Sequence, residues 1–151
     1  MGVLHDYYRA SDRSTAATTL RTPPVRVVKR PGEPVFDAVD GKGIDPIVML
    51  TTLQSLLTGE SYDELPQADF ADVAVGGDNG PWITELPVRL RDALADSDDG
   101  RLRDTAQQWV RTEEFGLPTS ADDVLPFLQE LIALARRARD SGELLYCWSC
   151  L

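Results

Sequence analysis

The stretch that decides the fold is residues 122–151, DDVLPFLQELIALARRARDSGELLYCWSCL. Its first part carries apolar residues at the i, i+3, i+4 and i+7 spacing of an amphipathic helix. We expect Asp122 or Asp123 to cap this helix, because a short acidic side chain accepts hydrogen bonds from free backbone N–H groups. Arginines near its end suit the negative end of the helix dipole, and Gly142 is expected to end it.

The segment Leu144–Leu151 that follows is almost wholly apolar, which predicts a central strand covered on both faces of a sheet. Cys147 and Cys150 lie three residues apart in it, so their side chains should point to opposite faces. This placement favours two structural thiols over a redox pair, which would sit at the start of a helix. It also disfavours a zinc site, which needs about four ligands, because His5 is the only histidine.

Upstream, strand-like and helix-like patterns alternate and are separated by Pro and Gly. Strands are predicted at Gly2–Ala10, Val25–Val28, Val35–Val39, Asp69–Val75 and Trp82–Glu85, the last two joined by the loop at Gly76–Gly80 and Pro81. Helices are predicted from the Ser11 or Asp12 cap to Leu20, from Asp45-Pro46 to Gly59, from Thr84 or Leu86 to Leu94, and from Leu102 to an end before Gly116. The length suits one domain. We therefore predict a single α+β domain over residues 1–151, with about four helices packed on a small mixed or antiparallel sheet that includes the C-terminal strand.

The composition is that of a globular protein, with 42% hydrophobic and 26% charged residues. No apolar run approaches the length of a membrane span, and the N-terminus lacks a signal-peptide pattern. We therefore expect a cytoplasmic protein that has no membrane partner. Arginine greatly outnumbers lysine, which indicates a GC-rich bacterial genome.

The formal net charge of −10 is spread unevenly along the chain. Residues 1–30 hold six bases against two acids, whereas residues 31–88 hold eleven acids against one base. Such an acidic segment disfavours nucleic acid as a ligand. It favours either plain solubility or a basic protein partner. The candidate interaction surface consists of Asp37, Asp40, Glu60, Asp63, Glu64, Asp69, Asp72 and Asp78.

No motif survives as a catalytic residue, a metal ligand or a cofactor site. Residues 40–43 lack the glycine spacing and the Ser or Thr of a phosphate loop, and a calcium loop over residues 37–48 fails because Val48 stands where Glu is required. Both observations favour a turn that leads to the Asp45 cap. His5 shares one face of the first strand with Val3, and Asp6 should lie on the other face, which favours a hydrogen-bonded structural histidine.

Four stretches together carry a family resemblance. They are Met1-Gly2-Val3-Leu4, Ile44-Asp45 leading to Leu56-Leu57-Thr58-Gly59, Gly80–Leu94, and Arg137-Ala138-Arg139-Asp140-Ser141-Gly142 followed by the apolar C-terminal strand. In these stretches the chain resembles the YfbM-like family, a group of small uncharacterised bacterial proteins. The resemblance implies helices packed on a mixed sheet and supplies no established activity. The sequence departs from the family pattern at Leu50, Thr51 and Gln54, where aromatic and histidine residues are common.

Two functions remain open from the sequence. The first is a non-enzymatic protein-binding domain, comparable to an immunity or antitoxin protein, that uses the acidic segment. The alternative is an enzyme or a small-ligand-binding protein with an unfamiliar site near His5 and the Gly76–Gly80 loop. A polar pocket with converging titratable groups near His5 would favour the alternative. Nothing in the sequence indicates an oligomeric state.

Overall fold

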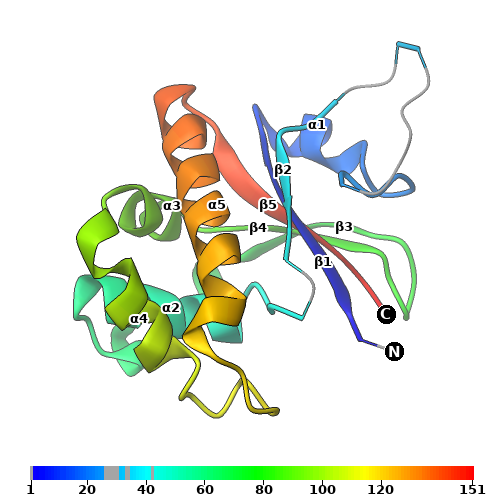
Figure 1. Ribbon diagram of the computed structural model, residues 1–151. Coiled ribbons are helices and arrows are strands. Elements are labelled where there is room, and N and C mark those ends of the chain that lie inside the picture. The colour runs from blue at the N-terminus through cyan, green and yellow to red at the C-terminus, as the bar shows by residue number, and fades with distance from the viewer. Residues whose placement is uncertain (1, 26–30, 33–34, 42) are drawn as a thin grey trace.

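The computed structural model describes residues 2–25, 31–32, 35–41 and 43–151. Five antiparallel strands form one sheet in the order β2-β1-β5-β4-β3 (Figure 1). The strands are β1 (Leu4–Ala10), β2 (Ala38–Asp40), β3 (Ala71–Val75), β4 (Trp82–Glu85) and β5 (Leu144–Cys150).

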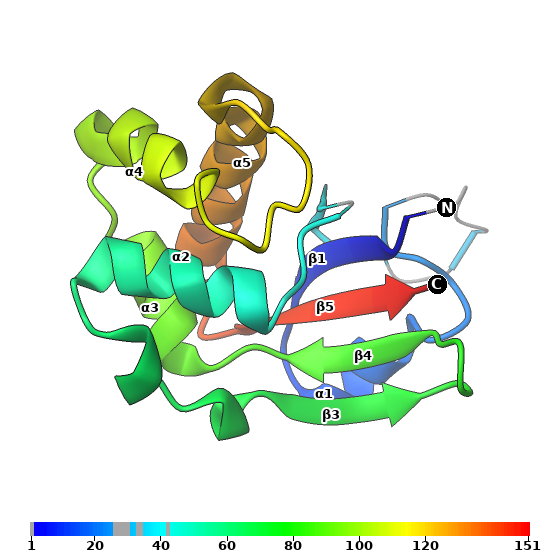
Figure 2. The ribbon, with the colours of Figure 1, turned by 90° about the horizontal axis from the view of Figure 1, so that it is seen from below.

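Five α-helices occur in the described residues, and four of them lie on one side of the sheet (Figures 1 and 2). Only α1 lies on the other side, where Ala16 packs with Tyr8, Tyr146 and Trp148. The predicted α+β class, with helices packed on a sheet that includes the C-terminal strand, is confirmed. The helices are α1 (Arg13–Ala17), α2 (Val48–Thr58), α3 (Val88–Ala95), α4 (Leu102–Trp109) and α5 (Ala121–Asp140), and the 3₁₀ turns are η1 (Tyr62–Glu64), η2 (Gln67–Asp69) and η3 (Asp99–Arg101).

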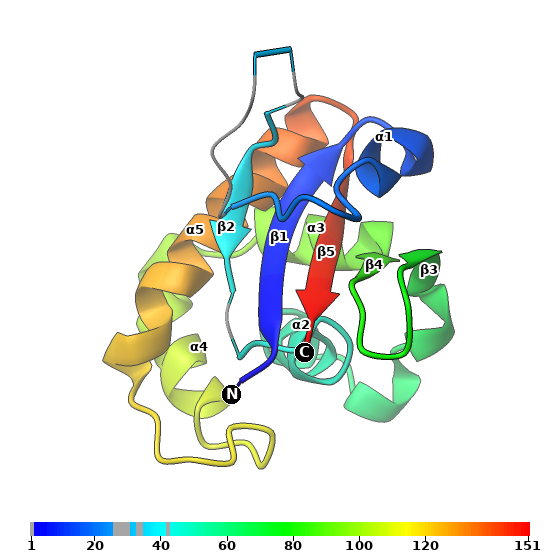
Figure 3. The same ribbon diagram turned by 90° about the vertical axis from the view of Figure 1, so that its right-hand side faces the viewer.

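The C-terminal strand β5 occupies the centre of the sheet, as its apolar sequence predicts. It pairs with β1 from Leu4↔Cys150 to Ala10↔Leu144 and with β4 on its other side (Figure 3). Its five middle residues are buried. Cys147 belongs to the core on the side of α2–α5, whereas Cys150 packs against the core beside α1. The prediction that the two cysteines point to opposite faces is confirmed.

Helix α5 packs on α3 and α4 and lies against β1, β2 and β5. The buried residues of α5 pack with leucines of α2 and α3 in one large core. Trp109 of α4 belongs to the same core and donates its indole N–H to the Met49 carbonyl oxygen at 3.1 Å. No helix in the described part of the chain is both long and apolar enough to cross a membrane.

The first residue of α5 differs from the prediction. Ser120 is the N-cap, in place of Asp122 or Asp123. Asp123 accepts hydrogen bonds from the Ser120 N–H and hydroxyl at 3.0 and 2.9 Å, so it serves as the acidic member of a capping box three residues into the helix. A carboxylate at that position satisfies the N-cap backbone and also suits the positive end of the helix dipole.

Two further boundaries are shifted. The predicted strand Val35–Val39 is displaced to β2, because pairing with β1 begins at Ala38 and Val35 is 79% exposed. The prediction for Val25–Val28 falls mostly outside the described residues.

Helix α2 begins at Val48, after the predicted Asp45-Pro46 start. Asp45 still caps the chain there, since its Oδ1 accepts from the N–H groups of Ile47 and Val48 at 2.9 and 2.6 Å.

The turn between β2 and α2 passes very close to the core. A Cβ atom added at Gly41 would overlap the Tyr7 ring and would lie 3.0 Å from the Phe127 ring. The Tyr7 ring is fully buried and its hydroxyl donates to the Ile44 carbonyl oxygen at 2.5 Å, so this ring cannot move aside freely. Position 41 therefore requires glycine for lack of space.

We predict that Gly41→Ala lowers the free energy of unfolding by about 1–3 kcal/mol, because it overpacks a filled core. Gly116→Ala is the matched control, since a Cβ atom there meets nothing within 4 Å. It should leave stability unchanged or raise it slightly by restricting the unfolded chain. Urea denaturation of the two variants and the wild type measures the difference, and equal stabilities would contradict the assignment of Gly41.

Candidate functional site

A cavity of about 550 Å³ lies between the sheet and the chain that enters α2. The residues just before α2, Asp45, Pro46 and Ile47, form one side of it, and His5 of β1 and Ser149 of β5 belong to the sheet side. Four of the five strands contribute residues to its wall: β1, β5, β4 and β3. The lining residues are Val3, His5, Gly43, Asp45, Pro46, Ile47, Asp72, Trp82, Thr84 and Ser149.

The register of the sheet brings His5 and Ser149 together in this wall. The two residues are direct partners on the antiparallel strands β1 and β5, so their side chains lie side by side on one face. His5 Nδ1 lies 2.8 Å from Ser149 Oγ, and the Cys147 sulfur lies 3.5 Å from the same Oγ. Both His5 and Ser149 are 7% exposed. The prediction of a hydrogen-bonded histidine is confirmed, and the structure adds that this histidine borders a cavity.

Burial lowers the pKa of His5 below its ordinary value of 6.5, and the negative charge of Asp45 opposes that shift more weakly. His5 is therefore neutral at pH 7 and has one N–H group and one lone pair to offer. Nδ1 is engaged with Ser149, which leaves Nε2 without a hydrogen bond from the described residues.

Thr84 supplies a second polar group of the same kind. It is 7% exposed and lines the cavity from β4, and its hydroxyl forms no side-chain hydrogen bond with another residue in the described part of the chain. Buried polar groups are almost always paired with protein, water or a ligand. The Thr84 hydroxyl and His5 Nε2 are therefore available to whatever occupies the cavity.

Two carboxylates complete the polar wall. Asp45 uses one oxygen to cap the start of α2. Asp72 on β3 is exposed and forms no ion pair with any described residue. Apolar surface comes from Val3, Ile47 and the Trp82 ring.

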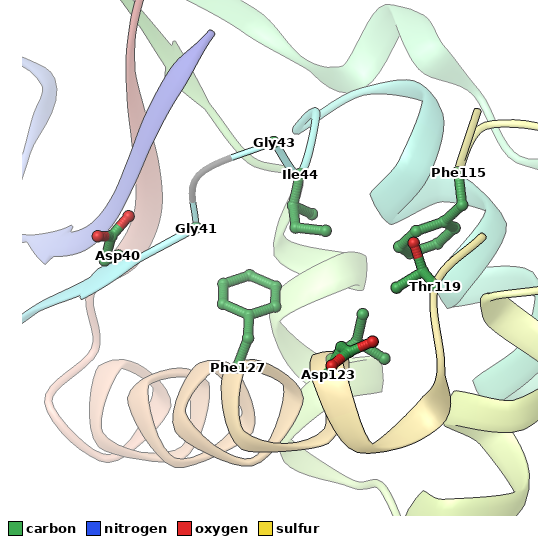
Figure 4. A pocket seen from close by; sticks show the side chains of 9 residues that line it. Asp40, Gly41, Gly43, Ile44, Phe115, Thr119, Asp123 and Phe127 are labelled. Atoms are coloured by element: carbon green, nitrogen blue, oxygen red, sulfur yellow. The ribbon is translucent and has the colours of Figure 1, made fainter. Parts of the chain in front are cut away.

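A second cavity, of about 500 Å³, lies on the far side of the Gly41–Ile44 turn (Figure 4). Phe127 of α5 and Phe115 give it aromatic walls, and Thr119 and Asp123 contribute polar groups. These polar groups already serve the fold: Asp123 belongs to the capping box, and the Thr119 hydroxyl donates to the Leu117 carbonyl oxygen at 3.0 Å. The cavity beside His5 is thus the better candidate for a functional site.

The acidic residues predicted as an interaction surface are divided by the fold. Asp37 precedes β2 and Asp40 ends it, at one edge of the sheet, and Asp37 forms ion pairs with Arg9 and Arg137 at 2.8 and 2.6 Å. Glu60 follows α2 and pairs with Arg89 at 2.7 Å. The other five are exposed on consecutive segments that lead to and follow β3, the opposite edge strand: Asp63, Glu64, Asp69, Asp72 and Asp78.

The remaining sequence candidates are structural. Residues 76–81 connect β3 to β4 as the predicted hairpin loop. Cys147 is fully buried, and burial raises its pKa to about 12, so this thiol stays protonated. Among the described residues, no three His, Cys, Asp or Glu side chains gather into a group that could hold a metal ion.

No family model matches the chain, and no curated protein or solved structure matches it either. The resemblance to the YfbM-like family stays a prediction. The site is therefore interpreted from its own geometry.

We predict that His5 makes the protein less stable in mild acid. Its folded pKa lies below 6.5, so the unfolded chain binds a proton first as the pH falls through that value. Above about pH 7.5 both states are neutral and the residue contributes no pH dependence. Replacing it by His5→Gln, which keeps a hydrogen-bonding group beside Ser149, should make the loss of stability between pH 7.5 and pH 5 shallower.

Urea unfolding of both proteins at a series of pH values measures this difference. The carboxylates are common to the two chains, so their contribution cancels in the comparison. Parallel stability curves would show that His5 titrates with an ordinary pKa.

Proposed function

We propose that this protein binds a small molecule in the cavity beside His5. One observation carries the proposal: Thr84 and His5 line a cavity of about 550 Å³, and neither the Thr84 hydroxyl nor His5 Nε2 forms a hydrogen bond with another described residue. Binding sites for small ligands have volumes of about 300–1,000 Å³ and combine apolar walls with a few fixed polar groups. The site shares His5 with the alternative drawn from the sequence, which placed a site near His5 and the Gly76–Gly80 loop, but no residue of that loop lines the cavity.

The surroundings of His5 also support its use as a proton acceptor. When Nδ1–H donates to Ser149 Oγ, the ring is held in place and Nε2 presents its lone pair to the cavity in a fixed position. Ser149 would be the positioning residue in such a step. We infer a bacterial cytoplasmic setting from the arginine-rich, cysteine-poor composition.

We predict that a library of small metabolites contains compounds that shift the amide signals of Thr84, Trp82 and Ser149 in ¹H–¹⁵N spectra. Ile47→Trp should abolish those shifts, because the larger ring fills the cavity from its rim. Thr119→Trp enlarges a residue of the second cavity and is the control that should retain them. Compounds that perturb only the second cavity, or a library that perturbs neither, would contradict the proposal.

A second candidate function is protein binding through the β3-side acids, defined as Asp63, Glu64, Asp69, Asp72 and Asp78. All five are exposed, and none forms an ion pair within the described residues. This distinguishes them from Asp37 and Glu60, whose charges are already compensated by arginine. An uncompensated acidic surface speeds association with a basic partner.

We predict that a basic protein is recovered from a lysate of the native host at low salt and lost at high salt, since screening weakens such contacts. The triple variant Asp63→Asn, Glu64→Gln, Asp69→Asn should lose it.

A control variant changes the net charge equally at exposed acids of α4 and α5. It carries Asp104→Asn, Glu130→Gln and Asp140→Asn and should retain the partner. Equal losses in both variants would assign the recovery to net charge alone.

A further inference from the structure

The wall of the His5 cavity carries negative charge. Asp45 and Asp72 contribute two carboxylates, and none of the described lining residues is lysine or arginine. His5 does not offset them, because burial keeps it neutral at pH 7. An anionic ligand would therefore meet repulsion that no described residue of the wall compensates.

The start of α2 could have favoured an anion, since helix N-termini present free N–H groups. Here the Asp45 carboxylate already accepts from the N–H groups of Ile47 and Val48. The positive end of the helix dipole thus faces a carboxylate of the protein itself. The charge that remains for a ligand is mainly that of Asp72.

Trp82 adds an aromatic surface to the same wall. The face of a tryptophan ring attracts cations more strongly than that of any other side chain. An ammonium group also carries three N–H donors, which need acceptors. The carboxylate of Asp72 and the hydroxyl of Thr84 can accept them, and Val3, Pro46 and Ile47 offer apolar surface to the rest of the molecule.

We propose that this cavity binds an organic cation, in which an ammonium or guanidinium group is joined to a small apolar body. Asp72 and Trp82 hold the charged group, Thr84 accepts a hydrogen bond from it, and His5 Nε2 accepts another in the tautomer whose Nδ1–H donates to Ser149 Oγ. This inference rests on the proposed small-molecule function and specifies its ligand class.

Three probes of similar shape and different charge test the ligand class: 2-phenylethylamine, 2-phenylethanol and 3-phenylpropanoate. Each is titrated into the protein at pH 7.5 and followed through the amide signals of Thr84 and Ser149. The amine should bind at least about tenfold more tightly than the alcohol, which corresponds to about 1.4 kcal/mol. The carboxylate should bind more weakly than either.

Asp72→Asn should bring the affinity for the amine down to that for the alcohol. Asp78→Asn is the matched control, because this exposed acid lies in the adjoining hairpin loop and does not line the cavity. Trp82→Leu should also weaken the amine selectively. Unchanged spectra outside the cavity establish that the variants fold.

Equal binding of amine and alcohol, or tighter binding of the carboxylate, would overturn the cation assignment and leave the small-molecule function standing. Absence of any shift with the amine would overturn the cation assignment as well. The metabolite library decides the small-molecule function separately, since its compounds carry all charges. The two proposals can thus fail independently.

Discussion

Pairing of β5 with β1 on one side and β4 on the other joins two parts of the chain that otherwise share no sheet contact. The pair β2-β1 comes from the N-terminal region and the hairpin β3-β4 from the middle. Because β5 lies between them, its side chains must fill both cores, and its five middle residues are accordingly buried. Every other element takes its position relative to this strand.

The candidate site is a direct product of that arrangement. Alternate residues of a strand face the same side, so the β5 register that buries Cys147 among the helices also turns Ser149 to that side. His5 is the direct partner of Ser149 on β1, and Trp82 is its partner on β4. The register of β5 therefore places Ser149, His5 and Trp82 side by side in the wall of the cavity. Asp45, which caps the chain before α2, lines the cavity as well.

Local chemistry in the sequence was enough to predict most of the elements. Asp45 caps the chain that leads into α2, and Gly59 ends this helix. The apolar character of Leu144–Leu151 specifies a strand covered on both faces. The site could not be predicted in the same way, because Thr84 and Ser149 are ordinary strand residues until β5 is placed between β1 and β4. Likewise, the acidic segment looks continuous along the chain, but the strand order separates Asp37 from Asp72 at opposite edges of the sheet.

The polarity of the cavity wall argues that it is more than a packing defect. The Thr84 hydroxyl and the His5 ring both border the cavity, where water or a ligand can pair with them. Most of the other buried positions of the sheet are apolar. Apolar side chains at positions 5 and 84 would fill the same strand positions but would give a ligand no polar group to recognise. The polar wall therefore fits a binding site better than it fits simple packing.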